Sequence, residues 1–78
     1  METVKLNLML KEKYGLVHVP YERKVRRWVE LTRSHMKTGQ SPENAGLLAA
    51  RLTFPYELRE RNVYESATVD ELLRLYPD

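Results

Sequence analysis

Positively charged side chains recur in one segment of the chain at a spacing that suits contact with phosphates. Residues 21–37 contain six Lys or Arg and two Glu, which gives this segment a charge of +4. On a helix, one face of the segment would carry Arg23, Arg26, Arg27, Arg33 and Lys37. Each phosphate that such a row neutralises releases counterions, so binding would weaken as salt rises. The alternative is a solvated outer face, because most charged helix faces bind no ligand.

Polar residues that could read bases follow this segment. They are Gln40, Ser41, Asn44 and Arg51. An asparagine can form two hydrogen bonds with adenine in the major groove, a contact worth roughly 1–3 kcal/mol of discrimination. The alternative is a local role, because Ser41 suits a helix N-cap and Asn44 would lie in the first helical turn. Ser41 is therefore expected to reach DNA only through a phosphate.

Two further arginines, Arg59 and Arg61, would flank the tip of a predicted β-hairpin at residues 56–65. The negative potential of a narrow minor groove favours arginine, so this hairpin could be the wing of a DNA-binding domain. Glu57 and Glu60 lie beside them, and the alternative is a charged edge strand that protects the sheet from aggregation.

The sequence shows no pattern typical of catalysis or of a bound metal. It contains no cysteine, which excludes disulfides and thiolate zinc sites. His18 and His35 lack the neighbouring ligands of a zinc site, and neither a Gly-rich phosphate loop nor a nucleophile motif is present. We therefore expect a protein that is not an enzyme and that needs no cofactor or metal.

The basic segment, from Tyr21 to about Lys37, is the clearest predicted helix. Its apolar positions recur every three or four residues and share one face: Tyr21, Val25, Trp28, Val29, Thr32 and Met36. Gly39 suits the left-handed residue that ends a helix. Ser41 and Pro42 then suit the N-cap and first position of another helix. The pattern predicts a helix-turn-helix whose recognition helix, residues 41–51, enters the major groove.

The recognition helix should be short and should be followed by the hairpin. We expect its inner face to contain Ala45, Leu48, Ala49 and Leu52. Pro55 disfavours helical geometry at the residue before it, so the helix should end there. Residues 56–60 and 63–66 read as two short strands, which would form the wing.

The two ends of the chain predict further elements. Residues 3–13 allow a strand, from the alternation of Val4, Leu6 and Leu8, or a helix that ends at Gly15; the flanking charges and the glycine favour the helix. Leu16–Pro20 is β-branched and predicts a short strand. Thr68 and Glu71 form a capping box, so a last helix should start there and bury Val69, Leu72, Leu73 and Tyr76.

The whole chain has the length of one small domain, residues 1–78, with a net charge of +2. Its 42% hydrophobic and 31% charged residues are close to the globular average. Its apolar runs are too short to span a membrane, and nothing resembles a signal peptide. We expect a soluble cytoplasmic protein of the α+β class, mainly α: a small winged helix-turn-helix with short helices and a β-hairpin wing.

A family resemblance supports this expectation. "YGLVHVPYERKVRRWV" resembles the opening of the pyocin activator family, in which a short helix leads through an apolar strand and a proline into a helix. "SPENAGLLAARLTFPYELRERNVYESATVDELLRLY" is similar to that family's second half and, more loosely, to phage excisionases and AlpA-like regulators. Leu52–Pro55 would correspond to their helix break, Tyr56–Glu65 to their strand and wing, and Asp70 with Leu72 to their terminal helix.

The resemblance implies a sequence-specific DNA-binding regulator of phage or phage-derived genes. Such a protein would regulate transcription or act as an excisionase-type directionality factor for recombination. Double-stranded DNA is the implied partner, and a recombinase, a polymerase or further copies of the chain could join it on DNA. Two departures from the family are the short wing and Gly46, which costs a helix interior roughly 1 kcal/mol relative to alanine.

A second class of function fits the same fold. The net charge of the chain is small, and residues 62–78 carry four acids against one arginine together with Tyr64 and Tyr76. These features would suit a protein-binding adaptor or inhibitor, phage-encoded or antitoxin-like, without specific DNA binding. Salt distinguishes the two classes, because DNA binding weakens steeply with salt and an apolar interface barely changes.

Overall fold

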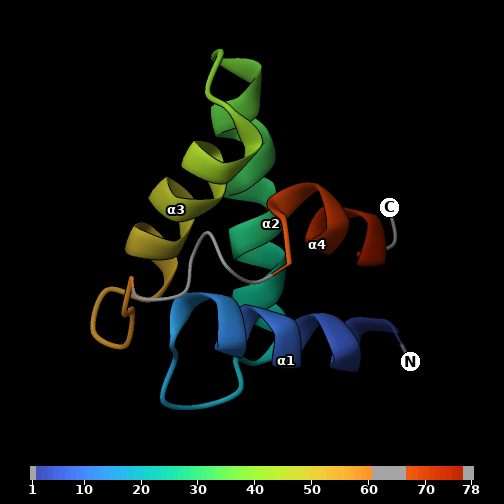
Figure 1. The fold of residues 1–78 in the computed structure, drawn as a ribbon, viewed down its shortest axis with the longest axis vertical. Helices are drawn as coiled ribbons and strands as arrows, with labels where there is room; N and C mark the ends of the chain where they lie inside the picture. Colours follow the sequence, from blue (N-terminus) through green and yellow to red (C-terminus); the bar gives the residue numbers. More distant parts are fainter. Residues whose placement is uncertain (1, 61–66, 77–78) are drawn as a thin grey trace.

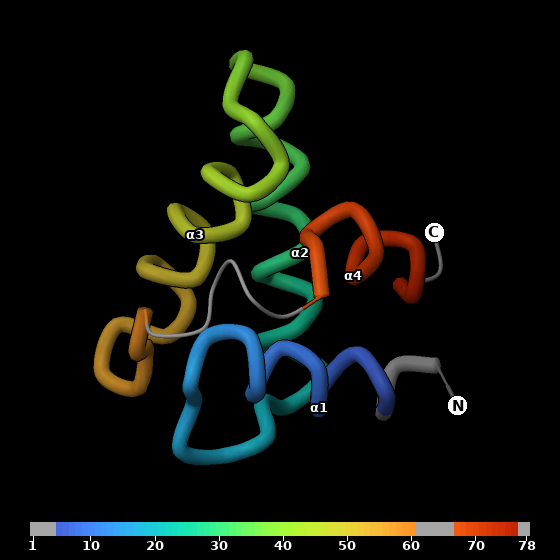
Figure 2. Tube along the Cα trace, viewed as in Figure 1, coloured from blue at the N-terminus to red at the C-terminus, as the bar shows by residue number. Residues whose placement is uncertain are grey.

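The computed structural model describes residues 2–60 and 67–76, and all regular structure within them is helical. The helices are α1 (Glu2–Tyr14), α2 (Glu22–Lys37), α3 (Pro42–Thr53) and α4 (Val69–Leu75). In Figure 1, α3 runs back beside α2, whereas α1 lies across the N-terminal end of α2. Figure 2 traces the same path and shows α4 on the other side of α2 from the C-terminal end of α3. None of these helices is long and apolar enough to cross a membrane.

The α2 helix forms as its pattern predicts. Val25, Trp28, Val29 and Thr32 are buried, whereas Tyr21 lies at the N-cap and is 77% exposed. Gly39 follows the C-cap with φ of 101°, the left-handed geometry that glycine favours. The tight turn between α2 and α3 is therefore confirmed.

The α3 helix starts and stops as predicted, but its buried face is broader. The hydroxyl of Ser41 accepts a hydrogen bond from the Asn44 N–H at 3.3 Å, and Pro42 holds the first helical position. Ala45 and Ala49 are buried as expected, but Leu47 is buried too, whereas Leu52 is 57% exposed. The prediction for Leu52 was wrong because α3 packs against more than one helix, so the buried face turns toward Leu47 and Ala50.

Gly46 explains how α3 can approach its neighbours so closely. A Cβ atom there would lie 2.6 Å from Val69 Cγ2 and 2.7 Å from the Tyr14 hydroxyl oxygen. The carbonyl of Gly46 also accepts a hydrogen bond of 3.0 Å from the buried Trp28 indole N–H. The residue that looked costly in a helix is thus required by packing.

The helical interpretation of the N-terminal segment is confirmed, and α1 ends at a left-handed glycine. Gly15 has φ of 59°, and the N–H of Leu16 donates to the carbonyl of Lys11 at 3.0 Å. This is the bond expected of a glycine-terminated helix.

The predicted strand at Leu16–Pro20 is wrong. The segment is an irregular connection between α1 and α2, and Val17 and Val19 are exposed. The N–H of His18 donates to the Glu57 carboxylate at 3.2 Å, so a side chain takes a bond that a strand would give to a neighbouring backbone.

The α+β, winged class is wrong as well, because the described part of the chain contains no strand and no hairpin. Residues 56–60, the first predicted strand, turn back on the end of α3: the N–H groups of Glu57 and Leu58 donate to the Phe54 carbonyl at 3.3 and 3.1 Å. The Arg59 N–H donates to the Tyr14 carbonyl at 2.8 Å. These bonds use the donors that a hairpin would need, while residues 63–66 lie outside the described residues.

A polar centre that the sequence did not indicate joins three helices. The Lys13 side chain, 1% exposed, donates to the Glu43 carboxylate at 2.9 Å and to the Ala67 carbonyl at 2.8 Å. The other carboxylate oxygen of Glu43 accepts a 2.7 Å bond from the Val69 N–H. Glu43 of α3 therefore caps α4, together with the predicted Thr68 cap, whose hydroxyl accepts from the Glu71 N–H at 3.3 Å.

Candidate nucleic-acid interface

The first turns of α2 gather the densest positive charge on the described surface. Arg23, Arg26 and Arg27 are exposed there, and with Lys24 and Glu30 they line a hollow of about 420 Å³. The hollow brings together three of the predicted phosphate contacts. Glu30 is the acid among them and makes the site less positive than the arginines alone.

Arg23 and Arg27 lie one helical turn apart, and neither forms a hydrogen bond or ion pair with another described residue. As far as the described residues are concerned, the N–H donors of both guanidinium groups can therefore bind solvent or a ligand. A planar guanidinium matches the two oxygens of a phosphate or a carboxylate. The pair can consequently hold an anion without first breaking an internal contact there.

Arg26 is placed differently, since it connects α2 to the end of α4. Its Nε donates to the Tyr76 hydroxyl at 3.2 Å. That hydrogen bond is the main reason that the pKa of the Arg26 guanidinium is raised. Arg26 stays charged, but part of its donor capacity is already used inside the molecule.

The far end of α2 combines basic and apolar groups. Arg33 is half-buried and Lys37 is exposed, and both line a shallow hollow of about 380 Å³ with Met36 and Leu73. The α4 helix thus borders this part of the basic face. Of the predicted contacts here, Lys37 is the more accessible.

The start of α3 presents an amide pair beside this end of α2. The Asn44 side-chain NH₂ donates to the side-chain oxygen of Gln40, and both residues are exposed. Ser41 is exposed but serves as the N-cap. Lys37, Gln40 and Asn44 therefore lie around one turn. Of these, Lys37 is on α2, about 15 Å along the helix axis from Arg27 at a rise of 1.5 Å per residue.

The remaining predicted contacts belong to the other end of α3 or lie beyond the described residues. Arg51, in the last turn, forms two hydrogen bonds with the Glu60 carboxylate, at 3.2 and 3.1 Å. These bonds lower the pKa of Glu60. Arg59 is exposed next to the turn at Gly15, and Arg61 lies outside the described residues. Arg51 is thus bound internally rather than presented by a recognition helix.

Lys24 was not among the predicted site residues, although it adjoins Arg23 in the sequence. It lines the basic hollow, and its ammonium group donates to the Thr53 carbonyl at the end of α3, at 3.2 Å. A cation at that place also suits the negative end of the helix dipole. The signal that could have identified Lys24 was the dense run of cations between residues 23 and 27.

Comparison of the chain with protein-family models, curated proteins and solved structures finds no match. The resemblance to the pyocin activator family therefore stays a prediction. Among the described residues, no group of three or more His, Asp or Glu side chains is arranged to hold a metal ion.

Proposed function

We propose that this chain is a small helical protein that binds double-stranded DNA through the outer face of α2 and the start of α3. The observation that carries the proposal is the pair Arg23 and Arg27, exposed and without an internal partner among the described residues. Each would contact a phosphate. Lys37, at the other end of α2, would contact a phosphate farther along the duplex.

The separation of these cations supports contact on both sides of a groove. Arg27 and Lys37 are about 15 Å apart along the helix axis. The major groove is about 12 Å wide. A helix laid across it would bring its two ends near opposite strands, with Gln40 and Asn44 beside the base edges.

Regulation of phage or phage-derived genes is the biological role that we propose for this binding. It rests on the resemblance of "YGLVHVPYERKVRRWV" and of the segment from Ser41 to Tyr76. The role does not require the wing, because the proposed contacts are on α2 and at the start of α3.

A fluorescence-anisotropy titration tests the proposal. The probes are a duplex from upstream of the protein's own gene and a duplex of random sequence, each at low and near-physiological salt. We expect binding that weakens as salt rises and that is tighter for the upstream duplex. In Arg23→Ala/Arg27→Ala, the slope of log affinity against log salt should become shallower by about 2, because each lost phosphate contact removes about 0.9.

A charge-matched control separates these two positions from total charge. Lys5→Ala/Arg74→Ala removes the same charge from two other exposed sites, on α1 and α4. It should leave the salt slope nearly unchanged. Equal losses in both double variants, or no binding even at low salt, would refute the proposed interface.

A further inference from the structure

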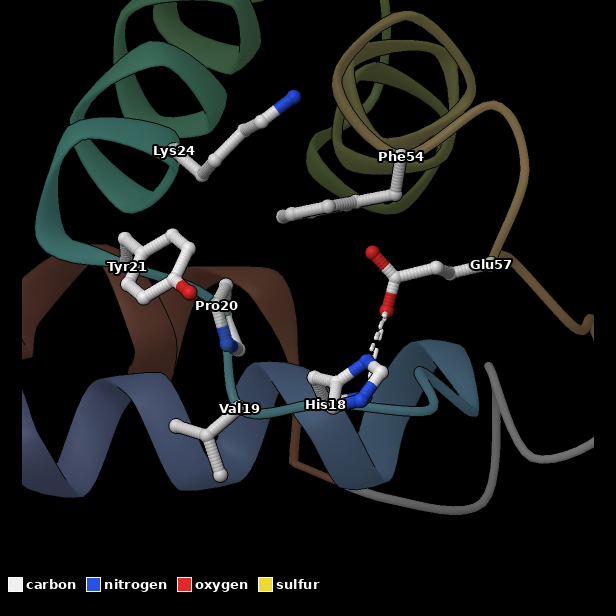
Figure 3. A pocket seen from close by; sticks show the side chains of 7 residues that line it. All are labelled: His18, Val19, Pro20, Tyr21, Lys24, Phe54 and Glu57. Atoms are coloured by element: carbon white, nitrogen blue, oxygen red, sulfur yellow. Dashed lines mark hydrogen bonds and ion pairs between the residues drawn. The ribbon is translucent and has the colours of Figure 1, made fainter.

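We infer that a groove at the start of α2 docks a protein segment that presents an apolar side chain flanked by carboxylates. The groove has a volume of about 390 Å³ and is shown in Figure 3. Its lining residues come from the α1–α2 connection, from α2 and from the end of α3: His18, Val19, Pro20, Tyr21, Lys24, Phe54 and Glu57. The inference goes beyond DNA binding and does not depend on it.

The lining of the groove is mainly apolar. Among the lining residues, Phe54 and Pro20 are buried, whereas Val19 is 41% and Tyr21 77% exposed. In Figure 3 the ring of Phe54 points across the groove toward the connection that carries Pro20. A cluster of exposed apolar side chains with a polar rim is typical of an interaction site.

Two of the polar groups in the groove, those of Lys24 and Glu57, already form hydrogen bonds within the molecule. The Lys24 ammonium group donates to the Thr53 carbonyl at 3.2 Å. On the opposite wall, the backbone N–H of His18 donates to the Glu57 carboxylate, at 3.2 Å. Because the lining is mainly apolar, burying the hydrogen-bonding edge of a nucleobase there would be costly, and the groove favours an aliphatic or aromatic side chain.

The charge beside the groove defines the rest of the partner. Lys24 lines both this groove and the basic hollow that contains Arg23 and Arg27, so the two sites adjoin. An apolar side chain in the groove would place neighbouring residues of the partner over these arginines. Guanidinium groups bind carboxylates with paired hydrogen bonds. The complementary partner is therefore an acidic segment with an apolar anchor.

Nuclear magnetic resonance of the ¹⁵N-labelled full chain, without DNA, tests this inference. The probe is a short peptide with a central leucine pair between glutamates. One control peptide replaces leucine by serine, and another replaces glutamate by glutamine. We expect the probe to shift the amide signals of Val19, Tyr21, Lys24 and Phe54, and both control peptides to bind more weakly.

A matched pair of variants locates the contact. Tyr21→Ser removes the exposed ring but places a favoured N-cap residue at the start of α2, so the fold should be kept. It should raise the Kd of the peptide by about fivefold or more, as loss of an interface aromatic commonly does. Leu8→Ser removes a side chain that is 51% exposed on α1 and should leave the Kd unchanged.

Three outcomes would overturn the inference. In the first, the peptide leaves the groove signals in place, or Tyr21→Ser binds it as well as the unaltered chain does. In the second, a single-stranded oligonucleotide shifts the groove signals and the peptide does not, which would assign the groove to bases. In the third, the groove signals move with protein concentration alone, which would assign the groove to a second copy of the chain. If the peptide does not bind, the result of the duplex titration with Arg23→Ala/Arg27→Ala is unaffected. Docking in the groove and binding of DNA can therefore be refuted separately.

Discussion

Gly46 shows how one residue sets the spacing of the helices. It is the point of α3 at which Tyr14, Trp28 and Val69, from the other three helices, come together. We expect Gly46→Ala to lower the free energy of unfolding, because overpacking costs about 1–3 kcal/mol and the better helix propensity of alanine returns only about 1 kcal/mol. Thermal unfolding followed by circular dichroism would measure the loss, at about 4–8 °C per kcal/mol for a domain of this size.

The clash can be separated from other effects of the substitution by making room for the new methyl group. Val69→Ala removes the Cγ2 atom that the added Cβ would approach to 2.6 Å. The double variant Gly46→Ala/Val69→Ala should be more stable than the sum of the single losses predicts, by at least about 0.5 kcal/mol. Strict additivity would show that the contact with Val69 is not the cause.

Glu43 is the second residue on which several elements depend. Its carboxylate pairs with the buried Lys13 ammonium group at 2.9 Å and accepts the Val69 N–H at 2.7 Å. Glu43→Gln should cost about 3 kcal/mol of unfolding free energy, because it removes a carboxylate that pairs with a buried ammonium group. The midpoint of urea unfolding would measure this loss.

Removing the charge of Lys13 as well provides the control. In Lys13→Met/Glu43→Gln, the glutamine keeps an acceptor for the Val69 N–H, and both charges of the Lys13–Glu43 pair are removed. Because apolar replacement of a buried ion pair is often neutral, stability should return to within about 1 kcal/mol of the unaltered chain. If the double variant is as unstable as Glu43→Gln, the loss in Glu43→Gln does not come from the charge of Lys13.

At the scale of elements, local signals predicted the helices and failed for the strands. Ser41, Thr68 and Gly39 act on neighbouring backbone groups, so their effect can be read from a few residues. A strand depends on a partner that the alternation of residues 56–60 does not reveal, and here the Arg59 N–H donates to Tyr14 instead. Lys13 and Glu43 are separated by 30 positions, so no local pattern could have paired them.

The candidate site was predictable to a similar extent. The stripe with Arg23 and Arg27 follows from helical periodicity, which sets the face of each residue. The role of Arg51 does not, because it depends on the chain folding back to bring Glu60 within 3.1 Å. Residues that act through neighbours on the same helix were identified, and residues that act through distant parts of the chain were not.

Ser41 allows the structural and binding roles of α3's start to be separated. Ser41→Ala removes the acceptor for the Asn44 N–H and should cost about 1 kcal/mol of stability. Ser41→Asp keeps an N-cap acceptor and adds a negative charge, so stability should be preserved while DNA affinity falls. Paired thermal unfolding and anisotropy measurements would check both expectations. DNA affinity unchanged in the aspartate variant would show that the start of α3 does not approach the duplex.

At the scale of the whole molecule, the α2–α3 pair presents different chemistry at its two ends. The turn carries Lys37, Gln40 and Asn44, whereas the opposite end combines the basic hollow with the apolar groove. Lys24 connects the hollow and the groove there by lining both. An acidic partner in the groove would cover Arg23 and Arg27, so it should compete with DNA for one end of α2 and leave the turn accessible.

The global stability of the chain should depend on pH through the ion pair between Arg51 of α3 and Glu60. Arg51 lowers the pKa of Glu60 through their hydrogen bonds, so the folded chain holds this proton less tightly than the unfolded chain does. The stabilisation by the Arg51–Glu60 pair is therefore fully present above the pKa that Glu60 has in the unfolded chain. It is lost as pH falls through the lower pKa that Glu60 has in the folded chain. Both side chains are well exposed, at 51% and 43%, so the effect should be small, about 0.2–1 kcal/mol, and should shrink in high salt.

Thermal unfolding across the acidic range would measure this contribution as the difference between the unaltered chain and Glu60→Gln. The difference should be largest near neutral pH and should vanish in strong acid, where Glu60 is protonated in both states. Glu12→Gln, at an exposed position on α1, is the control for losing one carboxylate. A Glu60→Gln curve parallel to that of the unaltered chain at every pH would mean that Arg51 does not hold Glu60 in solution.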